Sequence, residues 1–229
     1  MTEPATPSTP TRSLFNDRLE LIVAILLGLV SIATAYASFQ SALYDGKMTQ
    51  NYTIGSNKAT EAESLYLEGN QQYVQDSQLI NQLTDLSIDS ESSDPAIAAS
   101  AQAKYDTIYF QSVSPELESA IQWADAQNEA DPELWYSPLD NEDYLDHLFG
   151  GYQDLKAEAD AVIQEGDGFN DLSDRLTLNT VLMAIALFLL GVAAVVRATR
   201  TKLILGGVAV AIFLTAAILT AFIPFVGLG

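Results

Sequence analysis

The sequence predicts an all-α membrane protein with three transmembrane helices and an extracytoplasmic helical bundle on a coiled-coil-like stalk. Two observations lead to this fold class. Three apolar blocks, residues 21–39, 176–196 and 203–225, contain no Asp, Glu, Lys or Arg. Each is about 20 residues long, the length at which an α-helix crosses a bilayer core. The segment between the first two blocks has helix-start signals and no alternating β pattern.

The first span is predicted over residues 14–40. Residues 1–13 before it are rich in Thr, Pro and Ser, which indicates a disordered cytoplasmic tail. A cleaved signal peptide is the alternative, because Ala35-Tyr36-Ala37 resembles a small-x-small cleavage site. The apolar run is longer than the h-region of such peptides, which favours a retained span.

The second span is predicted over residues 175–197 and the third over 203–226, with a basic cytoplasmic loop at 198–202. The positive-inside rule sets the orientation. Apart from Arg175, the basic residues near the span ends are Arg12, Arg18, Arg197, Arg200 and Lys202. The N-terminus is therefore predicted to be cytoplasmic, and residues 41–174 and the C-terminus extracytoplasmic, in a multi-pass protein of the cell (plasma or inner) membrane.

Small residues recur along one face of the first two spans. Close packing drives helix association in lipid, and small residues permit it. The predicted helix-packing seam consists of Ala24, Gly28, Ser31, Ala35 and Ser38 in the first span and Thr180, Ala184 and Gly191 in the second. The spans either pack together through these faces or pack against copies of the same chain.

The extracytoplasmic segment, residues 41–174, is predicted to begin as a continuation of the first helix, since no proline occurs between residues 11 and 94. A loop is expected at residues 87–95 and a second helix at 96–111. Ser114-Pro115 and Ser137-Pro138 are helix-start signals, with Ser as the N-cap and Pro at the first helical position. The helix that starts at Ser137-Pro138 is expected to reach Gln164. Gly166 and Gly168 are expected to interrupt the helical structure before the chain enters the membrane.

The charge of this segment limits the classes of partner that are expected to bind it. It contains 27 Asp and Glu but only four lysines, a formal charge of −23. Such a surface repels nucleic acid and anionic lipid, which are therefore excluded as expected partners. The charge is compatible with binding to cations or to a basic protein surface, and with a saline exterior. It is also compatible with a surface whose charge only keeps the segment soluble.

The residue inventory argues against most catalytic chemistry. The chain has no cysteine and a single histidine, His147. Residues 165–171 are acidic and glycine-rich but lack the calcium-loop spacing. Asn51-Tyr52-Thr53 is a glycosylation sequon. No Asp, Glu, Lys, Arg or His lies inside the apolar blocks, which disfavours a proton relay or an ion-coupled transporter. We therefore predict no cofactor, no metal site and no enzymatic activity. Three large aromatic residues are expected to pack the bundle or to form a ligand pocket: Trp123, Trp135 and Tyr136.

Two short motifs lie where the chain leaves the first span and enters the second. They are Ala35-Tyr36-Ala37-Ser38-Phe39-Gln40 and, over residues 173–182, Ser-Asp-Arg-Leu-Thr-Leu-Asn-Thr-Val-Leu. With these motifs and its plan of spans, the chain resembles a family of bacterial three-span integral membrane proteins that has no assigned activity. The resemblance implies the plan and no functional residue.

Three classes of function follow as hypotheses. The first is a non-enzymatic membrane protein whose outward helical domain mediates assembly, with itself or with another membrane protein as an accessory subunit of an envelope complex. The second is a sensor or binding module for a cation or cationic ligand. An enzyme is third, supported only by the carboxylates Glu116, Glu118, Asp125 and Glu129. An oligomeric channel would require several copies, because three helices leave little room for a pore.

Overall fold

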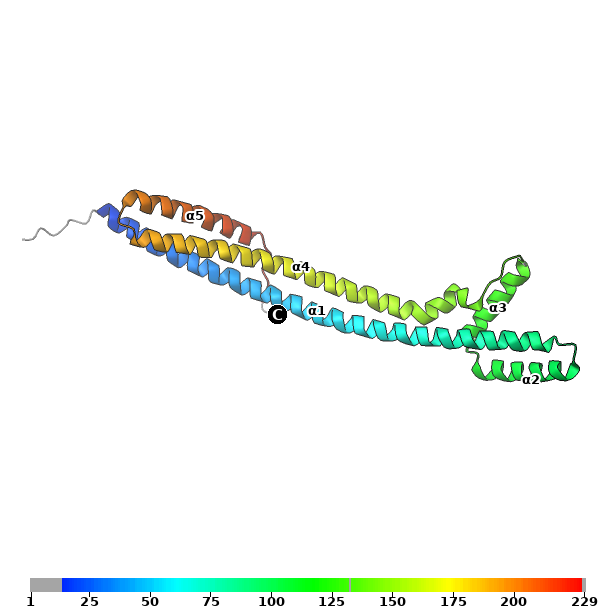
Figure 1. Cartoon of the computed structure of the whole chain (residues 1–229). Coiled ribbons are helices and arrows are strands. Elements are labelled where there is room, and N and C mark those ends of the chain that lie inside the picture. Colours follow the sequence, from blue (N-terminus) through cyan, green and yellow to red (C-terminus); the bar gives the residue numbers. More distant parts are fainter. Residues whose placement is uncertain (1–13, 132, 228–229) are drawn as a thin grey trace, which may run out of the picture. The chain divides into compact units, whose positions relative to one another are not determined.

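The computed structural model describes residues 14–131 and 133–227, and all regular structure in this part of the chain is helical (Figure 1). The predicted all-α class is confirmed. In chain order the elements are α1 (Leu14–Ser90), α2 (Pro95–Ser112), α3 (Pro115–Ala130), the 3-10 helix η1 (Pro138–Asp140), α4 (Glu142–Val195) and α5 (Thr199–Ala221).

Three of these helices, α1, α4 and α5, are long and apolar enough to cross a membrane. They contain the three uncharged blocks of the sequence, one block each. The prediction of three membrane-length helices is therefore confirmed, and the fold is consistent with an integral membrane protein.

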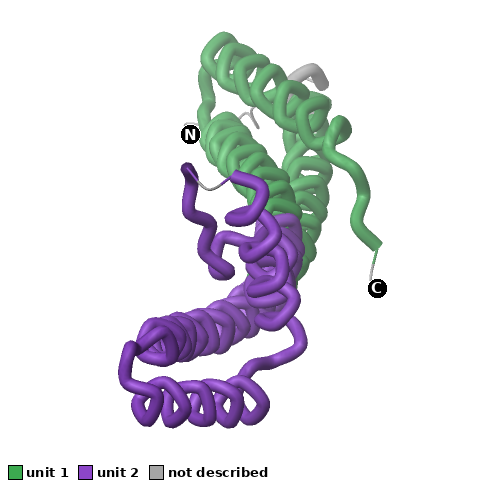
Figure 2. Tube along the Cα trace, turned by 90° about the vertical axis from the view of Figure 1, so that its right-hand side faces the viewer, with its two compact units in different colours: residues 1–52, 164–229 green, residues 53–163 purple. Residues whose placement is uncertain are grey.

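The chain divides into two compact units (Figure 2). The first contains the residues up to Tyr52 and those from Gln164 onward, and therefore the three apolar blocks. Along α1, every seventh residue is buried, a spacing that keeps one helix face against its neighbours. These residues are Val23, Val30, Ala37 and Tyr44. Val30, Ala37 and Tyr44 belong to a core that also contains Leu176, Met183 and Leu190 of α4 and Ala209 and Ala216 of α5.

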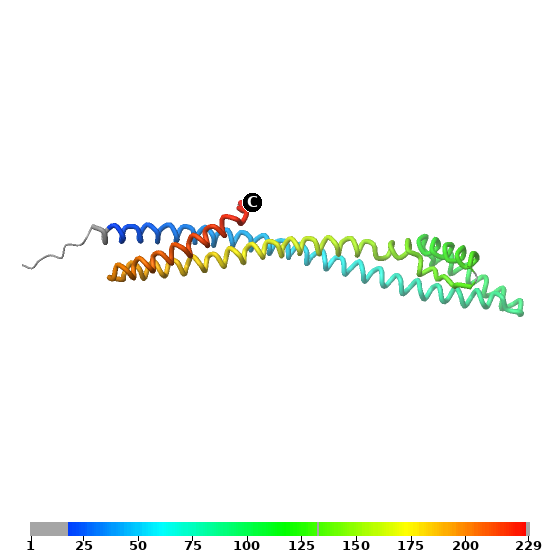
Figure 3. The backbone as a smooth tube through the Cα atoms, turned by 90° about the horizontal axis from the view of Figure 1, so that it is seen from above, coloured from blue at the N-terminus to red at the C-terminus, as the bar shows by residue number. Residues whose placement is uncertain are grey.

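The second unit comprises residues 53–163, in which the remainder of α1 lies beside the beginning of α4 (Figures 1 and 3). Every seventh residue of α1 is again buried: Gly55, Ala62, Gly69, Asp76 and Leu83. The two glycines permit a close approach of the backbones. A Cβ on Gly55 would lie 2.5 Å from Ile163 Cγ1, and one on Gly69 would overlap the Leu148 carbonyl oxygen.

Helix caps explain where the shorter helices begin. Ser114 Oγ accepts a hydrogen bond from Leu117 N at 3.1 Å, and Pro115 is the first helical residue, as predicted. Asp94 Oδ1 accepts one from Ala96 N at 2.9 Å and starts α2. Ser137 caps only the short η1, and α4 begins separately after Asn141.

Other predicted boundaries also differ from the structure, among them the end of the second span, since α4 ends at Val195, and the end of the third, since α5 ends at Ala221. The loop expected at residues 87–95 is shorter, because α1 extends to Ser90. The expected interruption at Gly166 and Gly168 is wrong, since α4 passes through both glycines. Gly166 is buried against Tyr52, where a Cβ would lie 2.8 Å from the ring. This packing outweighs a helix penalty of about 1 kcal/mol per glycine. Finally, α5 begins at Thr199, inside the predicted basic loop.

Candidate functional site

The predicted helix-packing seam does not form the contacts between helices within the chain. Ala24, Gly28, Ser31, Ala35 and Ser38 are all exposed, and the buried face of α1 is the neighbouring one that contains Val23, Val30 and Ala37. On α4, Ala184 is exposed, and Thr180 and Gly191 are half-buried. The seam residues of α1 therefore do not pack against the other spans of the same chain. Their packing against another chain stays a prediction.

The basic residues that predict orientation lie at the expected helix ends where they are described. Arg12 falls outside the described residues. Arg18, Arg197 and Arg200 are exposed, but Lys202 is buried in the first turn of α5. Its Nζ lies 3.7 Å from Glu20 Oε1 of α1. Lys202 therefore joins α5 to α1, and it also contributes to the positive charge at this end of the spans.

A polar clamp formed by Gln40, Ser41, Tyr44, Ser173 and Thr177 joins the elements of the first unit. Gln40 Nε2 donates to the Val226 carbonyl oxygen at 3.2 Å, and Val226 N donates to Gln40 Oε1 at 2.9 Å. Tyr44 Oη donates to the Pro224 carbonyl oxygen at 2.7 Å. Ser41 Oγ lies 2.8 Å from Ser173 Oγ and 3.0 Å from Thr177 Oγ1. The clamp thus holds both α4 and the segment after α5 to α1.

Removing the amide of Gln40 is expected to release the segment after α5. In Gln40→Ala, the buried N–H and carbonyl groups of Val226 lose their partner, at a cost of about 1–3 kcal/mol. The chain has no cysteine, so a Val226→Cys reporter can be labelled selectively with maleimide. Labelling should be faster in the Gln40→Ala background than in Gln50→Ala, an exposed glutamine of the same helix. Equal rates would contradict the clamp.

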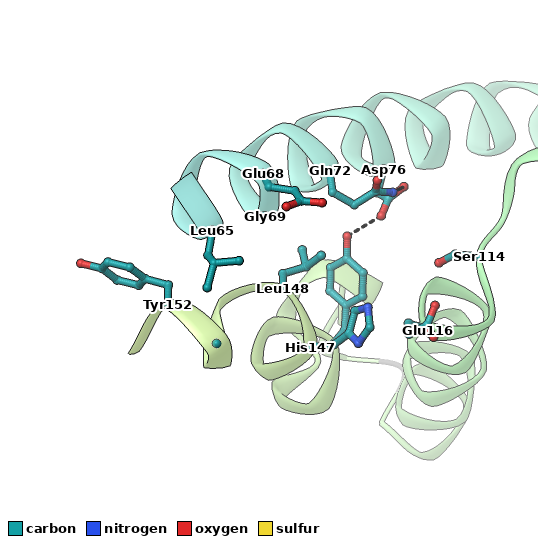
Figure 4. A pocket seen from close by; sticks show the side chains of 12 residues that line it. Leu65, Glu68, Gly69, Gln72, Asp76, Ser114, Glu116, His147, Leu148 and Tyr152 are labelled. Atoms are coloured by element: carbon teal, nitrogen blue, oxygen red, sulfur yellow. Dashed lines mark hydrogen bonds between the residues drawn. The ribbon is translucent and has the colours of Figure 1, made fainter. Parts of the chain in front are cut away.

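A cavity of about 380 Å³ lies in the second unit, where α1, α3 and α4 meet (Figure 4). Its polar lining includes Glu68, Gln72, Asp76, Glu116, Tyr144 and His147. Asp76 is only 3% exposed and Tyr144 only 2%. Tyr144 Oη donates to Asp76 Oδ2 at 2.7 Å, and Gln72 Nε2 donates to Asp76 Oδ1 at 2.9 Å.

The buried pair changes the acid–base behaviour of Tyr144. Burial, followed by the hydrogen bond to Asp76 and the charge of that carboxylate, raises the pKa of Tyr144 far above its usual value. The hydroxyl therefore stays protonated and remains a donor. No group of three or more His, Asp or Glu residues suited to a metal ion occurs in the described part of the chain. The pair joins α4 to α1, and the cavity beside it is open to a small polar ligand.

A second concavity, the aromatic groove, has a volume of about 350 Å³ and also lies in the second unit. Its lining includes Leu83, Ile88, Tyr105, Asp125, Trp135 and Tyr136. These residues come from α1, α2, α3 and the segment between α3 and η1. The groove therefore combines aliphatic and aromatic side chains with a carboxylate.

Asn128 holds the backbone of Tyr136, the residue that follows Trp135. Asn128 Nδ2 donates to the Tyr136 carbonyl oxygen at 3.1 Å, and Tyr136 N donates to Asn128 Oδ1 at 2.7 Å. The Tyr136 ring packs edge-on against Trp123 with 6.0 Å between centroids. Trp135 is nevertheless 76% exposed. The three aromatic residues were expected to pack the bundle or to form a pocket. Trp123 and Tyr136 pack against each other, whereas Trp135 faces solvent and lines the groove.

The four carboxylates proposed for an enzyme do not form one site. Glu116 lines the cavity beside Asp76, whereas Asp125 lines the aromatic groove. Glu118 is exposed and accepts a hydrogen bond that contributes to a raised pKa of Tyr109, after burial and nearby charge. Glu129 is exposed near the end of α3. His147 lies at the first cavity, beside Glu116 in Figure 4.

The sequon and the acidic turn also have defined surroundings. The Nδ2 atom of Asn51, where a glycan would attach, is buried and has no hydrogen-bond partner among the described residues. Attachment would therefore require the Asn51 side chain to leave this packing. Asp167, in the rejected calcium loop, accepts a hydrogen bond from Tyr52 Oη at 2.6 Å within the first unit.

Sequence reasoning missed two sets of residues. The first is the buried pair, because nothing in the sequence pairs Asp76 with Tyr144, which is 68 positions away. The polar clamp had a partial signal, because Gln40, Ser173 and Thr177 lie in the two motifs that the resemblance singled out. No family model, curated protein or solved structure matches this chain.

Proposed function

We propose that this is a non-enzymatic integral membrane protein whose acidic helical unit docks onto another protein, as an accessory subunit of an envelope complex. The observation that carries the proposal is Trp135, a large aromatic side chain that is 76% exposed and precedes Tyr136, whose backbone is held by two hydrogen bonds. A tryptophan side chain has few rotatable bonds and buries a large area on binding, and interfaces are enriched in it.

A second exposed aromatic supports an interaction surface on the same unit. Phe110 of α2 is 89% exposed, and Ile88 at the end of α1 is 65% exposed. Single exposed apolar residues are common, but Trp135 and Ile88 both line the aromatic groove, and exposed apolar residues that adjoin one another are typical of an interaction site. The same surface has no use in a purely solubilising domain.

Charge favours a different protein over a second copy as the partner of this unit. Residues 53–163 contain 22 Asp and Glu and three lysines. Two such units repel each other, whereas a basic surface is attracted. Self-association is better placed at the spans, where the exposed small residues of α1 carry no charge and allow close helix packing.

The proposed topology has the N-terminus in the cytoplasm and residues 41–174 outside, according to the distribution of lysine and arginine. The polar clamp supports the same side for the C-terminus, because Gln40 and Tyr44, at the end of the first apolar block, hold residues 224 and 226. A coiled-coil-like stalk is supported by the burial of every seventh residue of α1. Membership of the bacterial three-span family is proposed on the two motifs.

The cation-sensor hypothesis has one supporting feature, the carboxylates at the cavity beside Asp76. The channel hypothesis has no such feature among the described residues. Both stay predictions.

The test is the mass of the full-length protein after extraction from its own membranes in mild detergent, measured by native mass spectrometry. We expect a hetero-complex, and Trp135→Ser should lower the complexed fraction by roughly tenfold or more, since tryptophan hot spots contribute about 2 kcal/mol or more. Leu67→Ser is the control, because Leu67 is 64% exposed on α1 but does not line the groove. Recovery of the wild type as single chains, or equal loss in both variants, would refute the proposal.

A further inference from the structure

We infer that the aromatic groove binds an arginine side chain from a basic segment of the partner protein. This inference rests on the proposed function and adds the chemistry of recognition. The groove presents three aromatic side chains and one carboxylate, Tyr105, Trp135, Tyr136 and Asp125. A guanidinium group is planar and weakly hydrated, stacks on aromatic faces and pairs with carboxylates.

The electrostatics of the groove suit a cation. No lysine or arginine is among the described residues that line it. The field of Asp125 reaches the aromatic wall, since its charge contributes, after burial, to a raised pKa of Tyr105. Asp125 is exposed, so its charge is available to a ligand. A cation in the groove would therefore meet one carboxylate and no competing positive side chain.

The apolar part of the groove suits the aliphatic stem of a long basic side chain. Among the residues that line the groove, Leu83 is buried, and Ile80 and Ile121 are half-buried. Long basic side chains bury their methylene groups on apolar surface while the charged end stays near water or a counter-charge. The combination of aliphatic side chains, aromatic side chains and a carboxylate matches arginine better than a metal ion, which requires several oxygen ligands.

The composition of the second unit separates this partner from the same unit of a second copy. Residues 53–163 contain no arginine, so the same unit of another copy cannot supply one. The 22 acidic residues of that unit complement a segment in which the recognised arginine has basic neighbours. The occupant that the groove fits is therefore a basic stretch of a different protein.

The reporter for the test is Trp135 itself. The chain has two tryptophans, so Trp123→Phe in the full-length protein leaves Trp135 as the only one. The protein is placed in nanodiscs of uncharged phosphatidylcholine, and a short peptide that alternates arginine with leucine is added. We expect a saturable change in Trp135 emission. The same peptide with citrulline, which keeps the shape but not the charge of arginine, should bind at least about tenfold more weakly.

Matched substitutions separate the groove from the overall negative charge. Asp125→Asn should weaken the binding of the arginine peptide by about tenfold. Asp154→Asn, which removes the same charge from an exposed position on α4, should leave the affinity nearly unchanged. Equal effects of the two variants, or no response of Trp135, would overturn the inference. The hetero-complex with its Trp135 dependence would survive that result, so failure here is distinguishable from failure of the proposed function.

Discussion

Gly69→Ala is expected to destabilise the second unit by about 2 kcal/mol, although alanine is the better helix former. The new methyl group would overlap the Leu148 carbonyl oxygen, which belongs to the backbone of α4 and cannot move as a side-chain end can. Intrinsic helix propensity alone predicts a gain of about 1 kcal/mol, so the two effects have opposite signs. Thermal unfolding of the full-length protein, followed by circular dichroism in detergent, measures which effect dominates.

Gly151→Ala is the matched control on the opposite helix of the same unit. Its Cβ would lie 3.6 Å from a methyl group of Leu65, an ordinary contact, so the substitution should be neutral or slightly stabilising. If Gly69→Ala raised the unfolding temperature as much as Gly151→Ala, the close approach of α1 and α4 at Gly69 would be wrong.

Tyr144→Phe should cost about 1–3 kcal/mol at neutral pH, because the buried Asp76 carboxylate loses one of its two hydrogen-bond donors. The aromatic ring is kept, so the packing of Tyr144 against Leu117 and Ala120 should change little. Chemical denaturation of the full-length protein and of the variant gives the difference in unfolding free energy. Tyr152→Phe, which removes a hydroxyl at the same cavity, serves as the control.

The same substitution should alter the dependence of stability on pH. Burial, and then Asp76, raise the pKa of Tyr144 in the folded state above its unfolded value of about 10. The folded protein therefore binds this proton more tightly, so the contribution is fully present below pH 10 and is lost as the pH rises above it. Tyr144→Phe should reduce that alkaline loss. The remainder includes contributions from Tyr105 and Tyr109, whose pKa values burial raises, and from Tyr52 and Lys156, whose pKa values are raised by hydrogen bonds to Asp167 and Asp160. An unchanged alkaline slope would show that the hydroxyl is not coupled to folding.

The helical plan could be predicted from the sequence because its signals are local. An uncharged block of about 20 residues is costly to leave in water wherever it lies, so the apolar blocks identify three membrane-length helices without any tertiary information. Ser114 and Pro115 mark a helix start for a similar reason, since both act within one turn. The absence of proline from residues 11–94 likewise allows α1 to continue.

The faces of the helices could be predicted only in part. The seven-residue period is a property of the sequence, but several faces of α1 share it. Ala24 and Gly28 looked like the packing face because small residues permit close approach, whereas the structure buries Val30 and Ala37. Which face turns inward depends on the summed burial of all neighbouring helices, a quantity that no single helix encodes. The glycines of α4 show the same limit, since contact with Tyr52 keeps Gly166 helical.

By itself, the sequence determined the class of the protein, its three membrane-length helices and the acidity of the residues between them, because hydropathy and charge are sums over neighbouring residues. The tertiary structure alone shows that Asp76 is buried against Tyr144, that Gln40 holds the segment after α5, and that Trp135 is exposed while Trp123 is half-buried against Tyr136. These features depend on contacts between different elements of the fold. The free energy of such a contact depends on how far the surrounding side chains exclude water from it, and the sequence near either residue does not show this.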